Sequence, residues 1–448
     1  MGKYFGTDGF RGEANVVLKV EHAYKVGRYL GYYFGKDKKA KIVIGKDTRR
    51  SSYMFEYALV AGLTASGADA YLLHVTPTPS VSYVVRSERF DCGIMISASH
   101  NPFYDNGIKL INGDGYKIAE SIENEIEEYI DKEYDELPLA TGSNIGRTID
   151  YSIGRNRYIG YLISLATRSF KDKKVGLDLS NGAATTVAKG VFDALGAITY
   201  TINSEPNGVN INLECGSTHI EKLQKHVLDN SLDIGFAYDG DADRCLAVDD
   251  MGNIIDGDII LYLCGTYMKD NDELEKDTLV ATVMSNLGLF KGLEKKGISY
   301  EITSVGDRNV FENMMENGYS LGGEQSGHII FSKHSLTGDG VLTSIKLMEV
   351  MLESKTKLSE LHKELYLYPQ HLVNVRVMDK TKALDDEKVQ KSIKHVEGLL
   401  GDNGRLVIRQ SGTEPVIRVL VEAGTDKICR EYVEIITDTI KKSGYYIE

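Results

Sequence analysis

The chain lacks three features that would place it in other broad classes of protein. No apolar run approaches the length that crosses a bilayer, and the first eight residues contain no apolar segment typical of a secretory signal. The five cysteines are scattered without a Cys-x-x-Cys pair, which fits a reduced cytoplasmic protein better than a disulfide framework or a zinc site. Positive charge is in deficit, since the formal net charge is −13, and this argues against nonspecific nucleic-acid binding. We therefore expect a cytoplasmic protein with neither membrane nor nucleic-acid partners.

What the chain has is length and an alternating pattern of elements. Its 448 residues suffice for several domains, and a hydrophobic fraction of 42% predicts a large packed core. Strand-like runs alternate with helical stretches, which predicts α/β architecture with largely parallel strands.

The same order of parts occurs three times along the chain. Each copy has a strand running into a polar loop, then a helix, and then a second strand that opens with glycine. Such generic units can match by chance, but each copy also ends in a loop rich in reactive side chains. We therefore expect three related α/β domains that direct these loops to a common centre. The three loops are residues 97–101, 239–244 and 323–328.

The C-terminal part has a different pattern, which predicts a separate, smaller α+β domain. A tight turn over 411–415 separates its last two strands, and Asp426 is the expected N-cap of its closing helix. Pro369 marks a hinge near 366–370. The expected elements are strand 372–376, helix 386–400, strands 405–409 and 416–422, and helix 426–442. The expected domain boundaries are 1–150, 151–252, 253–366 and 367–448.

Ser99 lies at the end of the apolar strand 94–96, in a run of small and polar residues closed by Pro102. One interpretation is that its hydroxyl carries a covalent group, because it is held on a rigid scaffold beside His100 and ten residues before Lys109. The other is that Ser99 caps a following helix.

Asp239, Asp241 and Asp243 follow another apolar strand, 234–238, at alternate positions. Three carboxylates with small spacers suit a hard cation such as Mg²⁺ or Ca²⁺. An EF-hand is excluded because Arg244 stands where its glycine is needed, and the flanks have strand character. A solvated acidic loop is the remaining alternative.

Two further loops have the composition of ligand-binding segments. Glu324 and Ser326 form an acceptor and a donor suited to neighbouring sugar hydroxyls, and His328 is either a proton shuttle or structural. A turn in the C-terminal domain has the donors of a phosphate clamp, although a β-turn with surface arginines has the same composition. The clamp residues are Arg409, Ser411, Gly412, Thr413 and Arg418.

Cationic residues elsewhere could neutralise a phosphorylated Ser99 in this acidic protein. Arg11 lies among turn-forming glycines, the segment 45–49 adds Lys46 and Arg49, and Lys109 follows the serine loop.

Together these loops resemble the α-D-phosphohexomutase family over essentially the whole chain and in the family's order. The 323–328 segment, the 368–370 segment and the length point to the branch that acts on glucosamine phosphates. The motifs that carry the resemblance are residues 5–11, 96–102, 239–244, 323–328 and 409–415.

The resemblance implies four domains around one deep cleft. By motif position, Ser99 is the phosphoserine, and it joins Asp239, Asp241 and Asp243 in holding one Mg²⁺. Lys109 and His328 match positions linked to proton transfer, with Arg11 as a further catalytic cation; the sequence does not assign acid and base. Glu324, Ser326 and Arg244 would contact the substrate, with the clamp residues Arg409, Ser411, Gly412, Thr413 and Arg418.

The reaction implied by the resemblance interconverts glucosamine 6-phosphate and glucosamine 1-phosphate through a 1,6-bisphosphate. It feeds amino-sugar and cell-wall precursor synthesis. Glucosamine or glucose 1,6-bisphosphate is the expected activator, and a homodimer is one expected assembly. Three alternatives stay open: a mutase for glucose or mannose phosphates, a phosphatase, and a sugar-phosphate sensor without catalysis.

Overall fold

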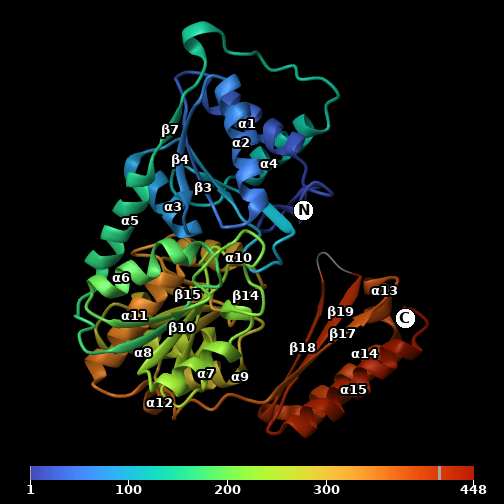
Figure 1. The fold of residues 1–448 in the computed structure, drawn as a ribbon. Coiled ribbons are helices and arrows are strands. Elements are labelled where there is room, and N and C mark those ends of the chain that lie inside the picture. The colour runs from blue at the N-terminus through green and yellow to red at the C-terminus, as the bar shows by residue number, and fades with distance from the viewer. Residues whose placement is uncertain (1, 412–414, 448) are drawn as a thin grey trace.

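The computed structural model describes residues 2–411 and 415–447. Three α/β domains and a smaller C-terminal domain follow one another along the chain (Figure 1). This is the predicted fold class. The first domain lies at the top of the view, the second and third form a joint lower body, and the C-terminal domain stands to one side.

The first domain is built on a seven-stranded sheet in the order β1-β2-β6-β5-β3-β4-β7. Its central strand β5 is buried along its whole length, so it is apolar without alternation, as expected for a strand covered on both faces. Its strands are β1 (Phe5–Gly6), β2 (Gly9–Glu13), β3 (Lys41–Lys46), β4 (Asp69–Val75), β5 (Cys92–Ile96), β6 (Asp105–Asn112) and β7 (Thr148–Asp150). Its helices are α1 (Val20–Phe34), α2 (Arg50–Ala65), α3 (Thr78–Glu88) and α4 (Glu120–Ile130).

The second domain carries a five-stranded sheet and the third a four-stranded sheet. Elements of the second domain are α5 (Ser152–Leu165), β8 (Lys174–Asp178), α6 (Ala188–Ala194), β9 (Ile198–Ile202), α7 (Glu221–Asn230), β10 (Ile234–Tyr238), β11 (Cys245–Asp249) and β12 (Ile254–Ile255). Those of the third are α8 (Gly257–Asp270), β13 (Thr278–Thr282), α9 (Leu287–Lys295), β14 (Ser299–Thr303), α10 (Asp307–Asn317), β15 (Leu321–Gly323), β16 (Ile329–Phe331), α11 (Gly340–Ser354) and α12 (Leu358–Leu361).

The three sheets repeat one topology. Each contains the strand order β6-β5-β3-β4, β11-β10-β8-β9 or β16-β15-β13-β14, with three parallel strands and an antiparallel fourth. The predicted third loop of each copy therefore joins the third strand to the antiparallel fourth. It begins at the carboxyl end of a parallel strand, which is where α/β sheets bind ligands.

The second and third domains share one continuous apolar core, which explains their joint body in Figure 1. Helix α5 packs over this body, and the hydroxyl of Tyr158 donates to Asp339 Oδ2 at 2.8 Å. Asp339 is the N-cap of α11, where its other oxygen accepts the N–H of Leu342 at 2.9 Å. Burial outweighs these hydrogen bonds and raises the pKa of Asp339 to about 6.

We predict that Asp339→Asn changes stability in a pH-dependent way. A carboxyl with a raised native pKa contributes stability at low pH and loses it as pH rises toward 6. The stability of the variant relative to wild type, measured as the difference in the free energy of unfolding, should therefore be about 1–1.5 kcal/mol higher at pH 8 than at pH 5. Urea unfolding at both pH values measures this, with Asp386→Asn at the N-cap of α14 as the control. A pH-independent difference would contradict the prediction.

The C-terminal domain packs two helices on the sheet β17-β19-β18 and adds the short helix α13, which the sequence did not predict. The closing helix begins at Asp426 as predicted, but its N-cap is Thr425, whose Oγ1 accepts the N–H of Ile428 at 3.3 Å. Asp426 occupies the first turn, where it favours the helix dipole. The elements are β17 (Gln370–Arg376), α13 (Lys380–Asp385), α14 (Glu387–Leu400), β18 (Arg405–Gln410), β19 (Val416–Glu422) and α15 (Asp426–Lys442).

A small set of polar contacts joins the C-terminal domain to the start of α9. Arg405 pairs with the buried Glu422 at 2.9 Å and donates to the carbonyl of Ser285. Lys291 donates to the Tyr368 hydroxyl at 2.9 Å and to the carbonyl of Asp402 at 2.8 Å. This anchor lies beside the extended connection that follows α12, where the hinge was predicted.

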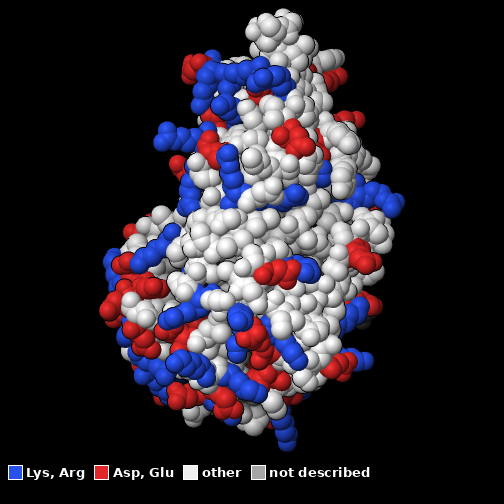
Figure 2. Space-filling view, turned by 60° about the vertical axis from the view of Figure 1, so that its left-hand side comes forward, with Lys and Arg blue, Asp and Glu red and all other residues white. Residues whose placement is uncertain are grey.

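Two properties of the structure concern its surface charge and the length of its apolar helices. Figure 2 shows lysines and arginines interspersed with aspartates and glutamates over the lower part of the face in view, without a broad basic surface there. Within residues 2–411 and 415–447, no helix is both long and apolar enough to cross a bilayer.

Candidate active site

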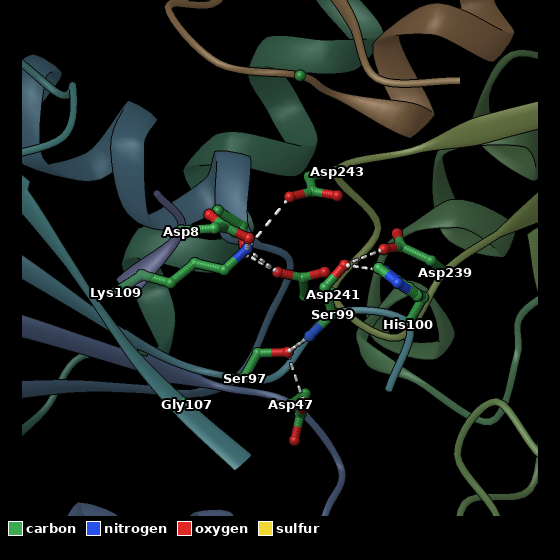
Figure 3. A network of polar contacts seen from close by, with 12 residues as sticks. Asp8, Asp47, Ser97, Ser99, His100, Gly107, Lys109, Asp239, Asp241 and Asp243 are labelled. Carbon is green, nitrogen blue, oxygen red and sulfur yellow. Dashed lines mark hydrogen bonds and ion pairs between the residues drawn. The ribbon is translucent and has the colours of Figure 1, made fainter. Parts of the chain in front are cut away.

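Ser99 lies in the turn between β5 and β6, and no helix follows it, so the helix-cap interpretation is wrong. Its backbone has a φ of 52°, in the left-handed region that a serine rarely adopts. Its hydroxyl donates to Asp239 Oδ2 at 2.6 Å (Figure 3). Gly240 allows this approach, because a Cβ there would lie 2.5 Å from the carbonyl oxygen of Ser99.

A buried polar scaffold holds the Ser99 turn from behind. The N–H of Ser99 donates to Ser97 Oγ at 2.9 Å, and Ser97 Oγ donates to Asp47 at 2.6 Å. Asp47 also pairs with Arg49, which donates to the carbonyls of Ser99 at 3.2 Å and Asn101 at 2.6 Å. Asn212, from the second domain, donates to the same two carbonyls. Several buried donors therefore oppose relaxation of the strained turn.

We predict that Asp47→Asn lowers the free energy of unfolding by roughly 3–5 kcal/mol, because it leaves the fully buried Arg49 without its charge partner. Urea denaturation followed by circular dichroism measures this. The control is Asp438→Asn, which breaks a half-exposed pair with Lys441 and should cost under about 1 kcal/mol. Equal losses in the two variants would contradict a structural role for the buried pair.

Asp239, Asp241 and Asp243 converge after β10, and one oxygen of each lies within 4.8 Å of the others. Asp241 Oδ1 and Asp243 Oδ1 are buried without a hydrogen-bond partner in the described chain. Buried orphan oxygens are costly, and an all-oxygen donor set suits a hard divalent cation. The triad therefore fits a metal such as Mg²⁺.

Lys109, on β6, neutralises part of this acidic cluster. Its Nζ lies 2.8 Å from Asp241 Oδ2, 3.2 Å from Asp243 Oδ2 and 3.4 Å from Asp8 Oδ2. Burial alone would lower the pKa of Lys109, but these carboxylates raise it well above 10.5. Arg11 pairs with Asp8, so both predicted cations reach the site. Lys109 is therefore charged in this protein.

The other predicted cations have different partners. Lys46 pairs with the buried Glu56 and points at the ring of Tyr53, 4.2 Å from its centroid, so it does not serve the serine turn. The backbone N–H of Arg244 donates to Asp239 Oδ1 at 3.2 Å, and its side-chain Nε is buried without a hydrogen-bond partner in the described chain.

His328, at the start of β16, faces Asp243, with 3.8 Å between Nδ1 and Oδ1. Its Nε2 accepts the N–H of Gly338 at 3.0 Å, which leaves Nδ1 as the nitrogen for proton exchange. Burial would lower the pKa of His328, but contact with Asp243 and the nearby Asp307 raises it above 6.5. Burial lowers the pKa of His100 to about 4, together with Arg244 and Arg11, so His100 is neutral at pH 7.

A cavity of about 430 Å³ is lined by part of this cluster, while Ser99, Lys109, Asp239 and Asp241 are not among its lining residues. All three α/β domains line it, which bears out the common centre expected from the repeat. Glu324 and Ser326 both face it, as predicted for the sugar loop. Its lining includes Asp8, Arg11, His100, Asp243, Arg244, Asp307, Glu324, Ser326 and His328.

Of the predicted clamp residues, the structure describes Arg409, Ser411 and Arg418 in the C-terminal domain, and none of the described residues of that domain lines the cavity. Arg409 and Arg418 sit directly opposite each other on β18 and β19. Burial and the neighbouring Arg418 lower the pKa of Arg409, whereas the carboxylate of Glu324 raises it. Ser411 is buried at the end of β18, and its carbonyl accepts from Lys380 at 2.6 Å. Gly412 and Thr413 lie outside the described residues.

Sequence reasoning missed three acidic residues that the structure places at the site. Asp8 lies inside a recognised motif but was passed over in favour of Arg11. Asp47 lies between Lys46 and Arg49, and the sequence points to those two cations rather than to Asp47. Asp307 follows Gly306, whose φ is 123°, at the start of α10. A glycine before a helix that starts with a carboxylate is a signal that could have drawn attention to it.

Three α/β units that meet at a serine, an aspartate triad and a sugar-sized cavity define a phosphohexomutase arrangement. Family models describing the phosphoglucomutase/phosphomannomutase domains match the chain in order: domain I at residues 2–136, domain II at 156–252, domain III at 256–368 and the C-terminal domain at 372–439. The chain belongs to this family of phosphohexomutase enzymes.

The chain is also similar over most of its length to curated proteins of one branch of this family. The chain is 72% identical to phosphoglucosamine mutase of Lachnoclostridium phytofermentans over 94% of both chains, and 64% identical to phosphoglucosamine mutase of Lachnospira eligens over 100% of both. Its fold is similar to that of Aspergillus fumigatus N-acetylphosphoglucosamine mutase, solved in complex with GlcNAc-6P and magnesium. That likeness has a TM-score of 0.72 and 17% identity over 98% of this chain and 96% of the other.

Proposed function

We propose that this chain interconverts glucosamine 6-phosphate and glucosamine 1-phosphate through a phosphorylated Ser99 and a 1,6-bisphosphate intermediate. The observation that carries the proposal is the Ser99 hydroxyl, held in a strained turn 2.6 Å from a carboxylate of the triad. The high identity to phosphoglucosamine mutases supports glucosamine as the sugar. A sensor would not need this nucleophile, and a phosphatase would not need a second, distant anion site.

In the first half-reaction, O1 of glucosamine 6-phosphate attacks the phosphoryl group on Ser99. The P–O bond to Ser99 Oγ breaks, and glucosamine 1,6-bisphosphate forms. In the second, Ser99 Oγ attacks the 6-phosphoryl group of the reoriented bisphosphate, which releases glucosamine 1-phosphate. Phosphoryl transfer depends chiefly on positioning and on neutralising charge. The scaffold of Asp47 and Arg49 supplies the positioning of Ser99.

A divalent cation, which we propose to be Mg²⁺, would be held by Asp239, Asp241, Asp243 and a phosphoryl oxygen on Ser99. When bound, it supplies positive charge to the phosphoryl oxygens. Lys109 adds positive charge from the side of β6, and it stays protonated because its pKa is raised. Arg11 and Arg244 contribute guanidinium groups at the cavity wall.

His328 is the proposed proton donor to the sugar oxygen that leaves in the second half-reaction. It lines the cavity, and because its Nε2 accepts the Gly338 N–H, its neutral ring carries the proton on Nδ1. Lys109 is the candidate donor toward Ser99 Oγ, since it remains charged among three carboxylates. In the reverse reaction each group would take back the proton that it gave.

The C-terminal domain would bind the substrate's distal phosphate with Arg409 and Arg418 and then release it for reorientation. The adjacent arginines repel each other, so an anion between them is favourable. We propose that the domain closes by bending at 366–370 while the Arg405 anchor persists. Glucosamine or glucose 1,6-bisphosphate would prime Ser99, because a bisphosphate can phosphorylate the free hydroxyl.

The test measures kcat/KM for the 6-phosphates of glucosamine, glucose and mannose with Mg²⁺ and a priming bisphosphate. Glucosamine 6-phosphate should be preferred by at least about tenfold. A preference for glucose or mannose 6-phosphate would overturn the substrate assignment. Phosphate release without isomerisation would make the protein a phosphatase.

Three further expectations stay proposals. The domain boundaries are proposed at 1–150, 151–252, 253–366 and 367–448, with β12 completing the second sheet just past residue 252. All five cysteines are buried and unpaired, which supports work in the reducing cytoplasm. A homodimer remains a prediction.

A further inference from the structure

Asp307 is a carboxylate in the cavity that the proposed reaction does not use. It is the first residue of α10 and lines the same cavity as Glu324 and His328. The proposed substrate carries a phosphate, and both half-reactions transfer phosphoryl groups. A carboxylate on this wall repels those anions, and Lys117, at 2.7 Å, offsets part of that repulsion.

The contacts of Asp307 leave one of its two oxygens available. Oδ1 accepts from Lys117 Nζ at 2.7 Å and from the N–H of Arg308 at 2.9 Å, which fixes the carboxylate plane. Oδ2 accepts no hydrogen bond from any residue that the structure describes. His328 Nε2 lies 3.9 Å from Oδ2, and because that nitrogen accepts the Gly338 N–H, it does not donate to Oδ2.

Each of the other acidic groups lining the cavity has a partner for one of its oxygens, and the unpartnered Asp243 Oδ1 belongs to the triad. Asp8 pairs with Arg11 and Lys109, and Asp243 pairs with Lys109. Glu324 Oε1 accepts the N–H of Gly306 at 3.1 Å, which ties the sugar loop to the segment that carries Asp307. Asp307 Oδ2 is thus an anchored acceptor on the cavity wall beside the proposed sugar loop.

We infer that Asp307 is the specificity-determining residue that binds the 2-ammonium group of glucosamine. This inference rests on the proposed function and deepens it. Glucosamine differs from glucose only at C2, where it has an ammonium group instead of a hydroxyl. A hydroxyl is served equally by a neutral acceptor, whereas an ammonium gains a charge-assisted hydrogen bond from a carboxylate. Lys117 orients the carboxylate, and Asp307 selects the sugar.

The test compares kcat/KM for glucosamine 6-phosphate and glucose 6-phosphate in the wild type and in Asp307→Asn. The amide keeps the shape and an acceptor for Lys117 but loses the charge. The glucosamine-to-glucose ratio should fall by about tenfold or more. Asp307→Glu should restore part of the ratio. Glu324→Gln is the control, because it faces hydroxyls common to both sugars and should lower both activities alike.

A pH series gives a second readout. In the wild type the ratio should fall as pH rises through the pKa of the sugar amine, because the neutral amine loses its pairing with Asp307. In Asp307→Asn the ratio should be flat. A wild-type ratio retained in Asp307→Asn, or a ratio changed only in Glu324→Gln, overturns the inference. Failure of the wild type to isomerise glucosamine 6-phosphate instead overturns the proposed function.

Discussion

Replacing Ser99 with alanine is expected to lower mutase turnover by roughly three orders of magnitude or more. The reaction would lose the atom that gives the phosphoryl group in the first transfer and accepts one in the second. The turn should survive, because the contacts that hold it are made by the main chain of Ser99 and by Ser97. Turnover is measured with glucosamine 6-phosphate, and intact mass is measured after incubation with a sugar bisphosphate. The wild type should gain one phosphoryl group at Ser99, and the variant none.

Ser97→Ala is the matched control, since it removes a hydroxyl two residues away. It loses the bridge between the Ser99 N–H and Asp47 but keeps the proposed nucleophile. We expect a loss of only about tenfold, with phosphoryl uptake retained. Near-normal turnover in Ser99→Ala, or equal losses in both variants, would rule out the phosphoserine mechanism.

Asp241→Asn is expected to weaken Mg²⁺ binding by at least about 100-fold and to lower turnover with it. Asp241 is fully buried, its Oδ2 already receives Thr78 Oγ1 at 2.5 Å and Lys109 at 2.8 Å, and its Oδ1 has no hydrogen-bond partner in the described chain. An amide in its place removes one negative charge from the cation and can turn its N–H₂ toward the metal position. Isothermal titration calorimetry with Mg²⁺ measures the change.

The control is Asp250→Asn, just after β11, where the carboxylate pairs with exposed Lys357 at 2.9 Å and takes no part in the triad. Its Mg²⁺ affinity should equal that of the wild type. Unchanged affinity in Asp241→Asn would place the cation elsewhere.

The fold class could be predicted from the sequence because local patterns show the order of strands and helices along the chain. Apolar runs such as β5 and β10 end in small and polar residues, and three copies of one pattern predicted three sheets that indeed share a topology. Helix ends were harder. Both Thr425 and Asp426 are good caps, and only the backbone geometry shows that Thr425 takes the position.

The candidate site was predictable where reactive residues cluster in the sequence, as at Asp239, Asp241 and Asp243. It was not predictable where function depends on contacts across long separations. Asp47 reaches the serine turn through Ser97, 50 residues away, and Asn212 does so from another domain. Asp307 has meaning only beside Lys117, 190 residues earlier. The sequence pattern does not indicate such contacts, because only tertiary packing brings these residues together.

The repeated strand order has a consequence for how the site can diversify. Each α/β unit contributes one loop from the same topological position, so each contribution can be altered by exchanging a few residues without disturbing the other two sheets. Ser99, the triad and Glu324 occupy three separate copies of that position. A lineage could therefore retune the loop that carries Glu324 for a new substrate while the loops that carry Ser99 and the triad stay fixed. Triplicated architecture makes the chemistry and the choice of sugar separately evolvable.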